Sequence, residues 1–264
     1  MRRVETYESD LDLARLLADA ADVITTSRFR ALDLVVDRKP DRTPVTDADT
    51  AVEDAVRALL AEHRPDDAVA GEERGGEVGA GRTWVLDPID GTKNFLRGVP
   101  AWATLIALVV DGTPVVGMIS APALGRRWWA GSGSGAYSSD TFGVRRLSVS
   151  RVAALEDAYL TTTHFGSWAK HHSQDAYLAL MDATWENRAF GDFWSHCLVA
   201  EGAMDIAAEA VVNPWDVAAA QVLVTEAGGR FSDLKGVERY DQGSALSTNG
   251  LLHDAALGVL RISG

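Results

Sequence analysis

The clearest chemical signal in the chain is a pair of carboxylates three residues apart. Asp87 and Asp90 belong to the run WVLDPIDGTKNF, residues 84–95, in which an apolar strand is followed by a predicted helix start. Pro88 cannot donate to a sheet and Gly91 permits a tight turn, so the two carboxylates can face one another and share a cation. Backbone N–H groups at the helix start would point toward an anion. The segment therefore predicts a place where metal and phosphate meet.

A hard divalent cation needs more oxygen ligands than two side chains supply. Mg²⁺ is typically held by carboxylates together with retained waters, so further acidic clusters should exist elsewhere in the chain. The candidates are Glu72-Glu73 after an apolar run, Asp216 at a predicted helix start, and the acidic helix start at Asp47 and Asp49. Taken singly, each has an ordinary explanation as a helix cap or a solvated charge, and for Asp47 that explanation is the better one.

Composition and spacing exclude several other kinds of chemistry. The 38 acidic and 25 basic residues give a net charge of −13, which disfavours binding to nucleic acid or to an anionic membrane. Cys197 is the only cysteine, so an internal disulfide and a thiolate-rich zinc site are excluded. Leu86 and Ile89 break the alternation that an EF-hand requires. The run GSGSG, residues 131–135, is interpreted as a turn rather than a dinucleotide loop.

Hydropathy and the first residues indicate where the protein works. No apolar run approaches the roughly 18 residues that a membrane helix needs. The segment Met1–Glu5 is charged rather than apolar, so no secretory leader is expected. We therefore expect a cytoplasmic protein.

Hydrophobic periodicity divides the chain into an α+β half, residues 1–145, and an α/β half, residues 146–264. The first half has expected helices at 10–30, with Asp10 as N-cap, and at 47–64, and expected strands at 68–70, 84–86, 105–110 and 115–119. The second half has expected strands at 159–162 and 206–208 and expected helices at 177–183, 197–203 and 218–227. A hairpin is expected at Asp111-Gly112. The glycine-rich segment Gly71–Gly81 is predicted to be a mobile flap.

Several separated motifs, in this order, make the whole chain resemble the inositol monophosphatase family. They are the pair Glu72-Glu73, the run DPIDGTKNF at residues 87–95, and Trp215-Asp216. The resemblance implies a layered αβαβα sandwich of the inositol monophosphatase and fructose-1,6-bisphosphatase type, assembled as a homodimer. It also implies a lithium-sensitive, Mg²⁺-dependent hydrolase of a small-molecule phosphate monoester, with no nucleic acid or membrane partner.

The resemblance also implies a set of metal ligands. Glu72, Asp87 and the Ile89 carbonyl would bind one ion, and Asp87, Asp90 and Asp216 would bind a second. The expected cofactor is Mg²⁺, two or three ions per site, with Mn²⁺ as a substitute. Such ions neutralise the phosphate and lower the pKa of a bound water during in-line attack.

Further roles follow from the same resemblance. Asp49 and Thr92 would orient the attacking water beside Glu72, with Lys39 nearby. Asp90, Gly91 and Thr92 would hold the phosphate. A nucleophilic aspartate of the haloacid-dehalogenase type is disfavoured, because that chemistry uses an Asp-x-Asp arrangement and the pair here is spaced Asp-x-x-Asp.

Substrate choice is expected to depend on Arg188, Asp192, Glu209 and Asp216. Asp192 puts an acidic residue after Gly191, and this feature with Asn213-Pro214 is similar to the histidinol-phosphatase branch of the family. An acidic residue beside the leaving group favours a cationic substrate, so L-histidinol phosphate is the expected one. Asp192 could instead cap the helix that follows it. The alternatives are an inositol-1-monophosphatase, a broad sugar-phosphate phosphatase, or a metal-binding regulatory protein without turnover.

Overall fold

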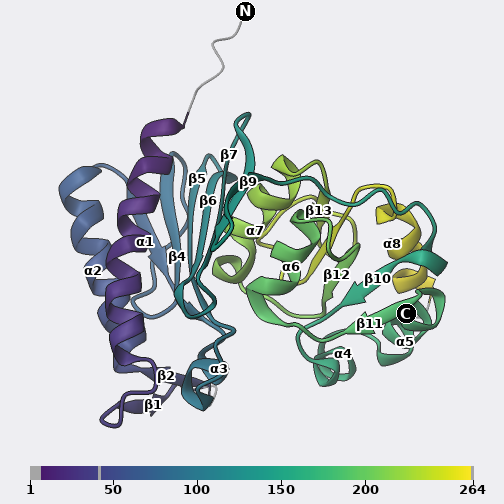
Figure 1. Cartoon of the computed structure of the whole chain (residues 1–264), viewed down its shortest axis with the longest axis horizontal. Coiled ribbons are helices and arrows are strands. Elements are labelled where there is room, and N and C mark those ends of the chain that lie inside the picture. Colours follow the sequence, from purple (N-terminus) through teal and green to yellow (C-terminus); the bar gives the residue numbers. More distant parts are fainter. Residues whose placement is uncertain (1–6, 41–42, 263–264) are drawn as a thin grey trace, which may run out of the picture.

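The chain folds into five stacked layers, helix, sheet, helix, sheet and helix (Figure 1). The computed structural model describes residues 7–40 and 43–262, so the segment Met1–Glu5 used above lies outside the described residues. This layering confirms the predicted αβαβα sandwich. Among the described residues, no helix is both long enough and apolar enough to cross a membrane.

The first sheet is built from residues 68–146. In the described chain it has seven strands, in the order of the sequence, and all neighbours are antiparallel except the first pair. The strands are β3 (Ala68–Gly71), β4 (Arg82–Asp90), β5 (Ala103–Val110), β6 (Thr113–Ala121), β7 (Arg126–Gly131), β8 (Gly135–Asp140) and β9 (Gly143–Arg146). The turn between β5 and β6 at Asp111 and Gly112 confirms the predicted hairpin. The GSGSG run is the turn between β7 and β8.

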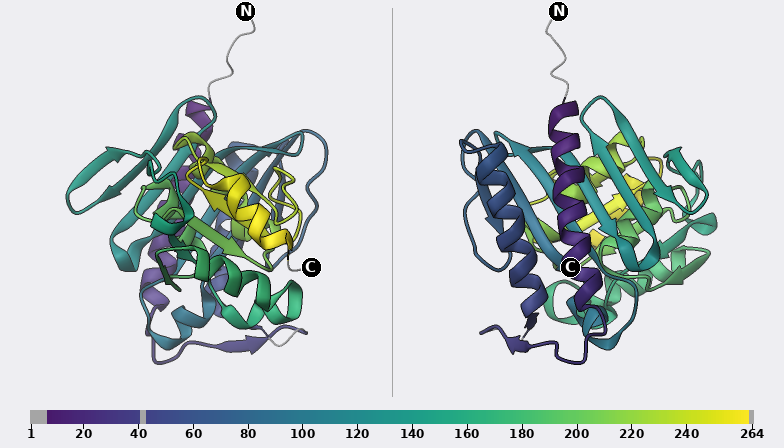
Figure 2. Two further views of the ribbon diagram at one scale, coloured as in Figure 1. Left: turned by 90° about the vertical axis from the view of Figure 1, so that its right-hand side faces the viewer. Right: turned by 60° about the vertical axis from the view of Figure 1, so that its left-hand side comes forward.

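Both faces of this sheet are covered by other elements. This explains why the central strands have apolar residues at successive positions, on both faces of the sheet. Trp84, Leu86 and Ile106 pack beneath the outer helices α1 (Glu8–Arg28) and α2 (Asp47–His63). These two helices lie side by side across the outer face (Figure 2). Val85 and Leu105 point the other way, into the molecule. A strand buried on both faces loses the polar alternation of a half-exposed one.

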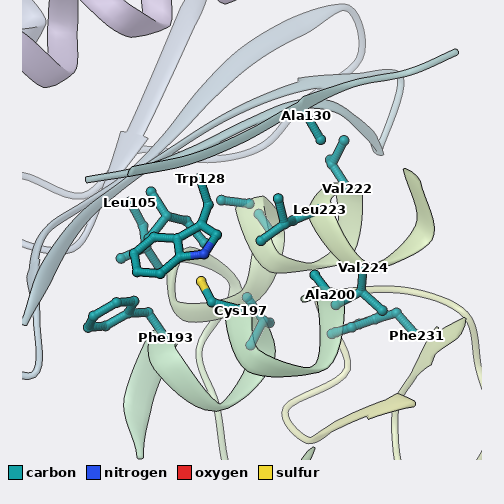
Figure 3. Close-up of a cluster of buried hydrophobic side chains, with 14 of the residues drawn as sticks. Leu105, Trp128, Ala130, Phe193, Cys197, Ala200, Val222, Leu223, Val224 and Phe231 are labelled. Carbon is teal, nitrogen blue, oxygen red and sulfur yellow. The ribbon is translucent and has the colours of Figure 1, made fainter. Parts of the chain in front are cut away.

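The central layer consists of α6 (Asp192–Ala200) and α7 (Pro214–Glu226). Their apolar side chains meet the inner face of the first sheet in one large core. Figure 3 shows Cys197 beside Trp128 and Phe193 in this core, as expected for a buried thiol. Because this layer packs on the first sheet, the chain after residue 145 contributes to the same core as the chain before it. The division into halves at 145 stays a prediction.

The second sheet and its helices form the other side of the molecule. Within the described chain, its five strands run in the order β11-β10-β12-β14-β13. They are β10 (Tyr159–Thr161), β11 (Glu186–Arg188), β12 (Ile206–Glu209), β13 (Arg230–Ser232) and β14 (Ala245–Thr248). The outer helices are α4 (Phe165–His171), α5 (Gln174–Ala183) and α8 (His253–Ile262). The remaining elements are β1 (Val36–Arg38), β2 (Pro44–Thr46), α3 (Thr92–Arg97), η1 (Pro122–Leu124) and η2 (Leu155–Asp157).

The expectation that Asp10 caps the first helix is wrong. The N-cap of α1 is Tyr7, and Asp10 lies within the first turn with its carboxylate buried. That carboxylate accepts hydrogen bonds from Arg82 (2.7 Å) and Arg64 (3.2 Å) instead. A buried charge needs opposite charges around it, and here the tertiary partners win over local capping.

Candidate active site

Asp87 and Asp90 are brought together by an irregularity at the end of β4. Asp87 pairs with Leu105 of β5 and Asp90 with Ala103, so one extra residue is inserted on the β4 side. A bulge of this kind re-aims side chains. The turn is held by Thr104, whose hydroxyl donates to the Pro88 carbonyl at 2.8 Å, and by the Ile89 N–H, which donates to Asp87 at 3.1 Å.

Gly91 allows the chain to pass from β4 into the short helix α3. Its φ of 80° lies in the left-handed region, and a Cβ at this position would come within 2.9 Å of the Ala101 carbonyl oxygen. Glycine is therefore required on both conformational and steric grounds. Directly after it, the Thr92 hydroxyl donates to the Ile89 carbonyl at 3.0 Å.

A third carboxylate comes from α7, 126 positions after Asp90 (216 − 90). Asp216 lies in the first turn of α7, where its Oδ2 accepts the Asn213 N–H at 2.7 Å in a capping box. It thus caps the helix and also reaches the cluster. Asp87, Asp90 and Asp216 each offer a carboxylate oxygen within 4.8 Å of the others.

These carboxylates repel one another in a poorly hydrated environment. Burial, followed by the charges of Glu72, Asp90 and Asp216, raises the pKa of Asp87 well above its usual range. Burial, followed by Asp192 and Asp216, does the same to the pKa of Asp90. Burial raises the pKa of Asp216 to about 7. Such a concentration of oxygen ligands with uncompensated charge fits a hard divalent cation.

Glu72 and Lys39 complete this side of the site. Glu72 lines the same pocket as Asp87, Asp90 and Asp216. The Lys39 ammonium lies 2.5 Å from Glu72 Oε1 and 2.7 Å from Glu73 Oε1. Burial opposes the charge of Lys39, but its bonds to Glu72 and Glu73 prevail and raise its pKa. The lysine therefore stays protonated and neutralises part of this carboxylate cluster.

Asp49 is a buried neighbour of the site rather than part of the pocket wall. Its Oδ2 accepts both the Thr46 N–H (2.8 Å) and the Thr46 hydroxyl (2.5 Å). Its Oδ1 has no hydrogen-bond partner among the described residues although it is buried. Burial raises the pKa of Asp49 to about 7, and the charges of Glu73 and Glu72 add to this effect. An unpartnered buried oxygen of this kind can accept a proton or a water.

The pocket has a volume of about 390 Å³ and is lined by residues from both halves of the chain. The first half supplies the carboxylate side with Glu72, Asp87, Ile89, Asp90, Gly91 and Thr92. The second half supplies Asp216 and an opposite wall that includes Thr163, Phe190 and Asp192.

Asp192 presents its carboxylate to this pocket and does not cap α6. The N-cap is Gly191, and within the described chain no side-chain cap bond is made there, so the capping alternative is wrong. The backbone φ of Asp192 is 50°, and its N–H donates to the Thr163 hydroxyl at 2.7 Å. Its Oδ2 accepts from Asn94 Nδ2 at 3.2 Å. Burial raises the pKa of Asp192, and Lys93 opposes that effect.

Glu209 lies behind this wall, whereas Arg188 lies outside it. The buried Glu209 carboxylate accepts from the Thr163 hydroxyl at 2.8 Å, and burial raises its pKa to about 8. Neither residue is among the described residues that line the pocket. The Arg188 guanidinium lies 2.8 Å from Glu186 and 5.9 Å from the ring centre of Tyr159, and its side chain is half exposed.

No role was predicted for Asn94 or Thr163, although both line the pocket. Asn94 stood within the quoted motif, so its position was available but its partner, Asp192, was not. Thr163 follows β10, whose neighbours β11 and β12 are parallel to it. The carboxyl ends of parallel strands are common binding positions, and this was the usable signal.

Comparisons with known proteins agree with this geometry. The inositol monophosphatase family matches residues 7–261. The chain is similar to a histidinol-phosphatase of Mycobacterium tuberculosis, with 57% identity over 94% of this chain and 96% of the relative. A histidinol-phosphatase of Streptomyces coelicolor is 49% identical over 96% of this chain and 97% of the relative.

Solved structures show the same architecture. An inositol monophosphatase from Zymomonas mobilis is 33% identical, covers 96% of this chain and 98% of its own, and superposes with a TM-score of 0.85. The Thermotoga maritima IMPase is 28% identical, covers 97% of this chain and 98% of its own, and has a TM-score of 0.86. Sequence and structure therefore agree that the chain belongs to the inositol monophosphatase family.

Proposed function

We propose that this protein is an Mg²⁺-dependent phosphatase that hydrolyses L-histidinol phosphate to histidinol and phosphate. The carrying observation is the carboxylate of Asp192 in the pocket wall, close to the phosphate-binding turn. A Cβ on Gly91 would lie 3.4 Å from Asp192 Oδ2. The relatives that are 57% and 49% identical over nearly the full chain are named for this activity, which supports the proposal.

The metal ligands in this proposal are Glu72, Asp87, the Ile89 carbonyl, Asp90 and Asp216. A cluster of buried and half-buried carboxylates with raised pKa values is the environment that a divalent cation stabilises. When bound, Mg²⁺ supplies charge neutralisation of the phosphate and a lowered pKa for water. We propose two or three Mg²⁺ per site, with Mn²⁺ as a substitute.

Other residues of the site act on the water and on the phosphate. We propose that the unpartnered Oδ1 of Asp49 and the hydroxyl of Thr92 orient the attacking water. Asp90 would share the phosphate end of the pocket with the backbone N–H groups after Gly91, which lie at the start of α3. Lys39 would restrain Glu72 through their 2.5 Å contact.

The leaving group is recognised by charge on the opposite wall. Histidinol carries an ammonium and an imidazole, so the carboxylates of Asp192 and Glu209 favour it over a neutral polyol. Asp192 would contact the leaving group directly, and Asp216 would line the pocket beside it. Glu209 would act through Thr163, because that hydroxyl bonds both Glu209 and the Asp192 backbone. The assignment of Arg188 finds no support in the pocket and stays a prediction.

The family resemblance also supports a homodimer that works in the cytoplasm. Sedimentation of the purified protein tests the first of these, because a dimer has a mass near twice 28.3 kDa.

Steady-state rates with Mg²⁺ test the proposed substrate. L-Histidinol phosphate, inositol-1-phosphate and fructose-1,6-bisphosphate should be compared under the same conditions. We expect kcat/KM for L-histidinol phosphate to exceed the others by about 100-fold, because an added buried charge pair contributes about 2–3 kcal/mol. Equal rates on all three would favour a broad sugar-phosphate phosphatase, and no release from any of them would favour a non-enzymatic protein.

A further inference from the structure

A buried carboxylate of α2 lies beneath the loop that carries Glu72. Glu53 is fully buried, and its Oε2 accepts the Glu73 N–H at 2.8 Å. Its Oε1 accepts the Arg74 N–H at 3.1 Å and Arg57 Nε at 2.8 Å. The groups that bond its two oxygens are therefore all donors, which matches the acceptor sites of a carboxylate.

The loop itself is shaped to receive this carboxylate. A Cβ at Gly71 would lie 2.2 Å from Glu53 Oε1, so only glycine leaves room for it. Arg57 closes the other side of the loop, because its guanidinium also donates to the Gly75 carbonyl at 2.5 Å. Gly71 thus leaves room for the Glu53 carboxylate, and Arg57 joins that carboxylate to the far side of the loop.

Glu72 is held by these contacts without touching Glu53. Its own N–H donates to the Leu86 carbonyl of β4 at 3.2 Å, one residue before Asp87. The next two N–H groups, those of Glu73 and Arg74, end on Glu53. Three successive peptide N–H groups are therefore fixed by acceptors outside the loop. The mobility predicted for Gly71–Gly81 stays a prediction, but the part near Glu72 is anchored.

We propose that Glu53 is a positioning residue that holds Glu72 beside Asp87 in advance of metal binding. The inference rests on the proposed function, in which Glu72 is a metal ligand. Partners behind the ligands typically change metal affinity by about 10- to 100-fold when they are removed. The affinity for Mg²⁺ should therefore depend on Glu53, although this side chain does not bind the ion.

The test is calorimetric titration of the metal-free, full-length protein with Mg²⁺ alone. Glu53→Gln keeps the shape but turns an amide N–H₂ toward a donor, so we expect Mg²⁺ to bind at least about tenfold more weakly. Asp54→Asn is the matched control, because Asp54 holds the same loop through an exposed ion pair with the Arg74 side chain at 2.7 Å. Its Mg²⁺ affinity should stay within about twofold of the wild type.

A second readout separates positioning from general damage. Saturating Mg²⁺ should return most of the kcat to Glu53→Gln, whereas a globally misfolded variant would not recover. Mg²⁺ affinity of Glu53→Gln within twofold of the wild type would overturn the proposal. If that variant does not fold, Gly71→Ala displaces the carboxylate without altering it, and an unchanged affinity there would overturn it equally. A wild type that binds no Mg²⁺ would instead refute the proposed metal ligands.

Discussion

Two sets of acidic side chains lie at or just behind the walls of one pocket, and they differ in what surrounds their carboxylates. Asp87, Asp90 and Asp216 crowd their oxygens within 4.8 Å of one another, and their pKa values are raised. On the opposite side, Asp192 lines the pocket and accepts from Asn94, whereas Glu209 lies behind the wall and accepts from Thr163. Burial raises the pKa values of these two carboxylates as well. The first set fits a multiply charged ion, and the second fits an organic cation.

The two sets also support different parts of the functional proposal. Asp87, Asp90 and Asp216 belong to the motifs by which the chain resembles the family, whereas the expected similarity to the histidinol-phosphatase branch rests on Asp192. A family architecture of this kind can keep its reaction while the opposite wall changes the leaving group. Changes in the two walls should therefore have different kinetic signatures.

The largest expected effect is that of Asp87→Asn. Loss of the central carboxylate should lower kcat/KM by about 10³-fold, because several kcal/mol of charge stabilisation depend on the metal. The metal-free variant should nevertheless melt no lower than the wild type, because one of several repelling charges is removed. Thermal unfolding in a chelator and phosphate-release rates measure the two outcomes. A strongly lowered Tm with retained activity would mean that Asp87 stabilises the fold and does not serve the metal.

Asp192→Asn should affect the substrate rather than the reaction. We expect KM for L-histidinol phosphate to rise about 10- to 100-fold, since a charge-assisted hydrogen bond is lost. KM for a neutral sugar phosphate should change little, and Mg²⁺ affinity should stay the same. An equal rise in KM for both substrates would show that Asp192 does not recognise the charge of the leaving group.

Acidification should weaken metal binding in a predictable direction. The pKa of metal-free Asp216 is raised to about 7, and a carboxylate must lose its proton to bind a metal. Protons therefore compete with Mg²⁺ as pH falls through 7, and the affinity should drop about tenfold between pH 8 and pH 6 for one proton displaced. Calorimetry at the two pH values measures this change. A pH-independent affinity would mean that the cluster is already ionised without metal.

Thr163→Val should give the smallest effect. It removes the hydroxyl that joins Glu209 to the Asp192 backbone, a contribution of about 1 kcal/mol, or roughly fivefold in KM for L-histidinol phosphate. Thr163→Ser keeps the hydroxyl and should restore the wild-type KM. If the serine variant is as weak as the valine variant, the methyl group rather than the hydroxyl matters.

Motif spacing predicted the proposed metal ligands better than the residues of the opposite wall. Asp87, Asp90, Glu72 and Asp216 stand in recognisable runs, and the fold brings all four to one pocket. Sequence could not predict that Asn94 and Thr163 hold Asp192, because those bonds join positions 98 and 29 residues apart.

Errors and omissions had the same physical origin. Asp10 was expected to cap the first helix, yet its carboxylate accepts hydrogen bonds from Arg64 and Arg82, which lie far away in the sequence. Glu53 looks like any acidic residue of an amphipathic helix, and only the tertiary structure shows its burial beneath the loop. Local rules fail where a buried charge is compensated by residues far away in the sequence.

The most direct test of the account is a crystal structure of the protein soaked in Mn²⁺, with anomalous scattering used to locate the ions. We expect anomalous peaks between the carboxylates of Asp87, Asp90 and Asp216, with Glu72 beside them. Ions found only elsewhere, or a cluster that stays metal-free at saturating Mn²⁺, would contradict it.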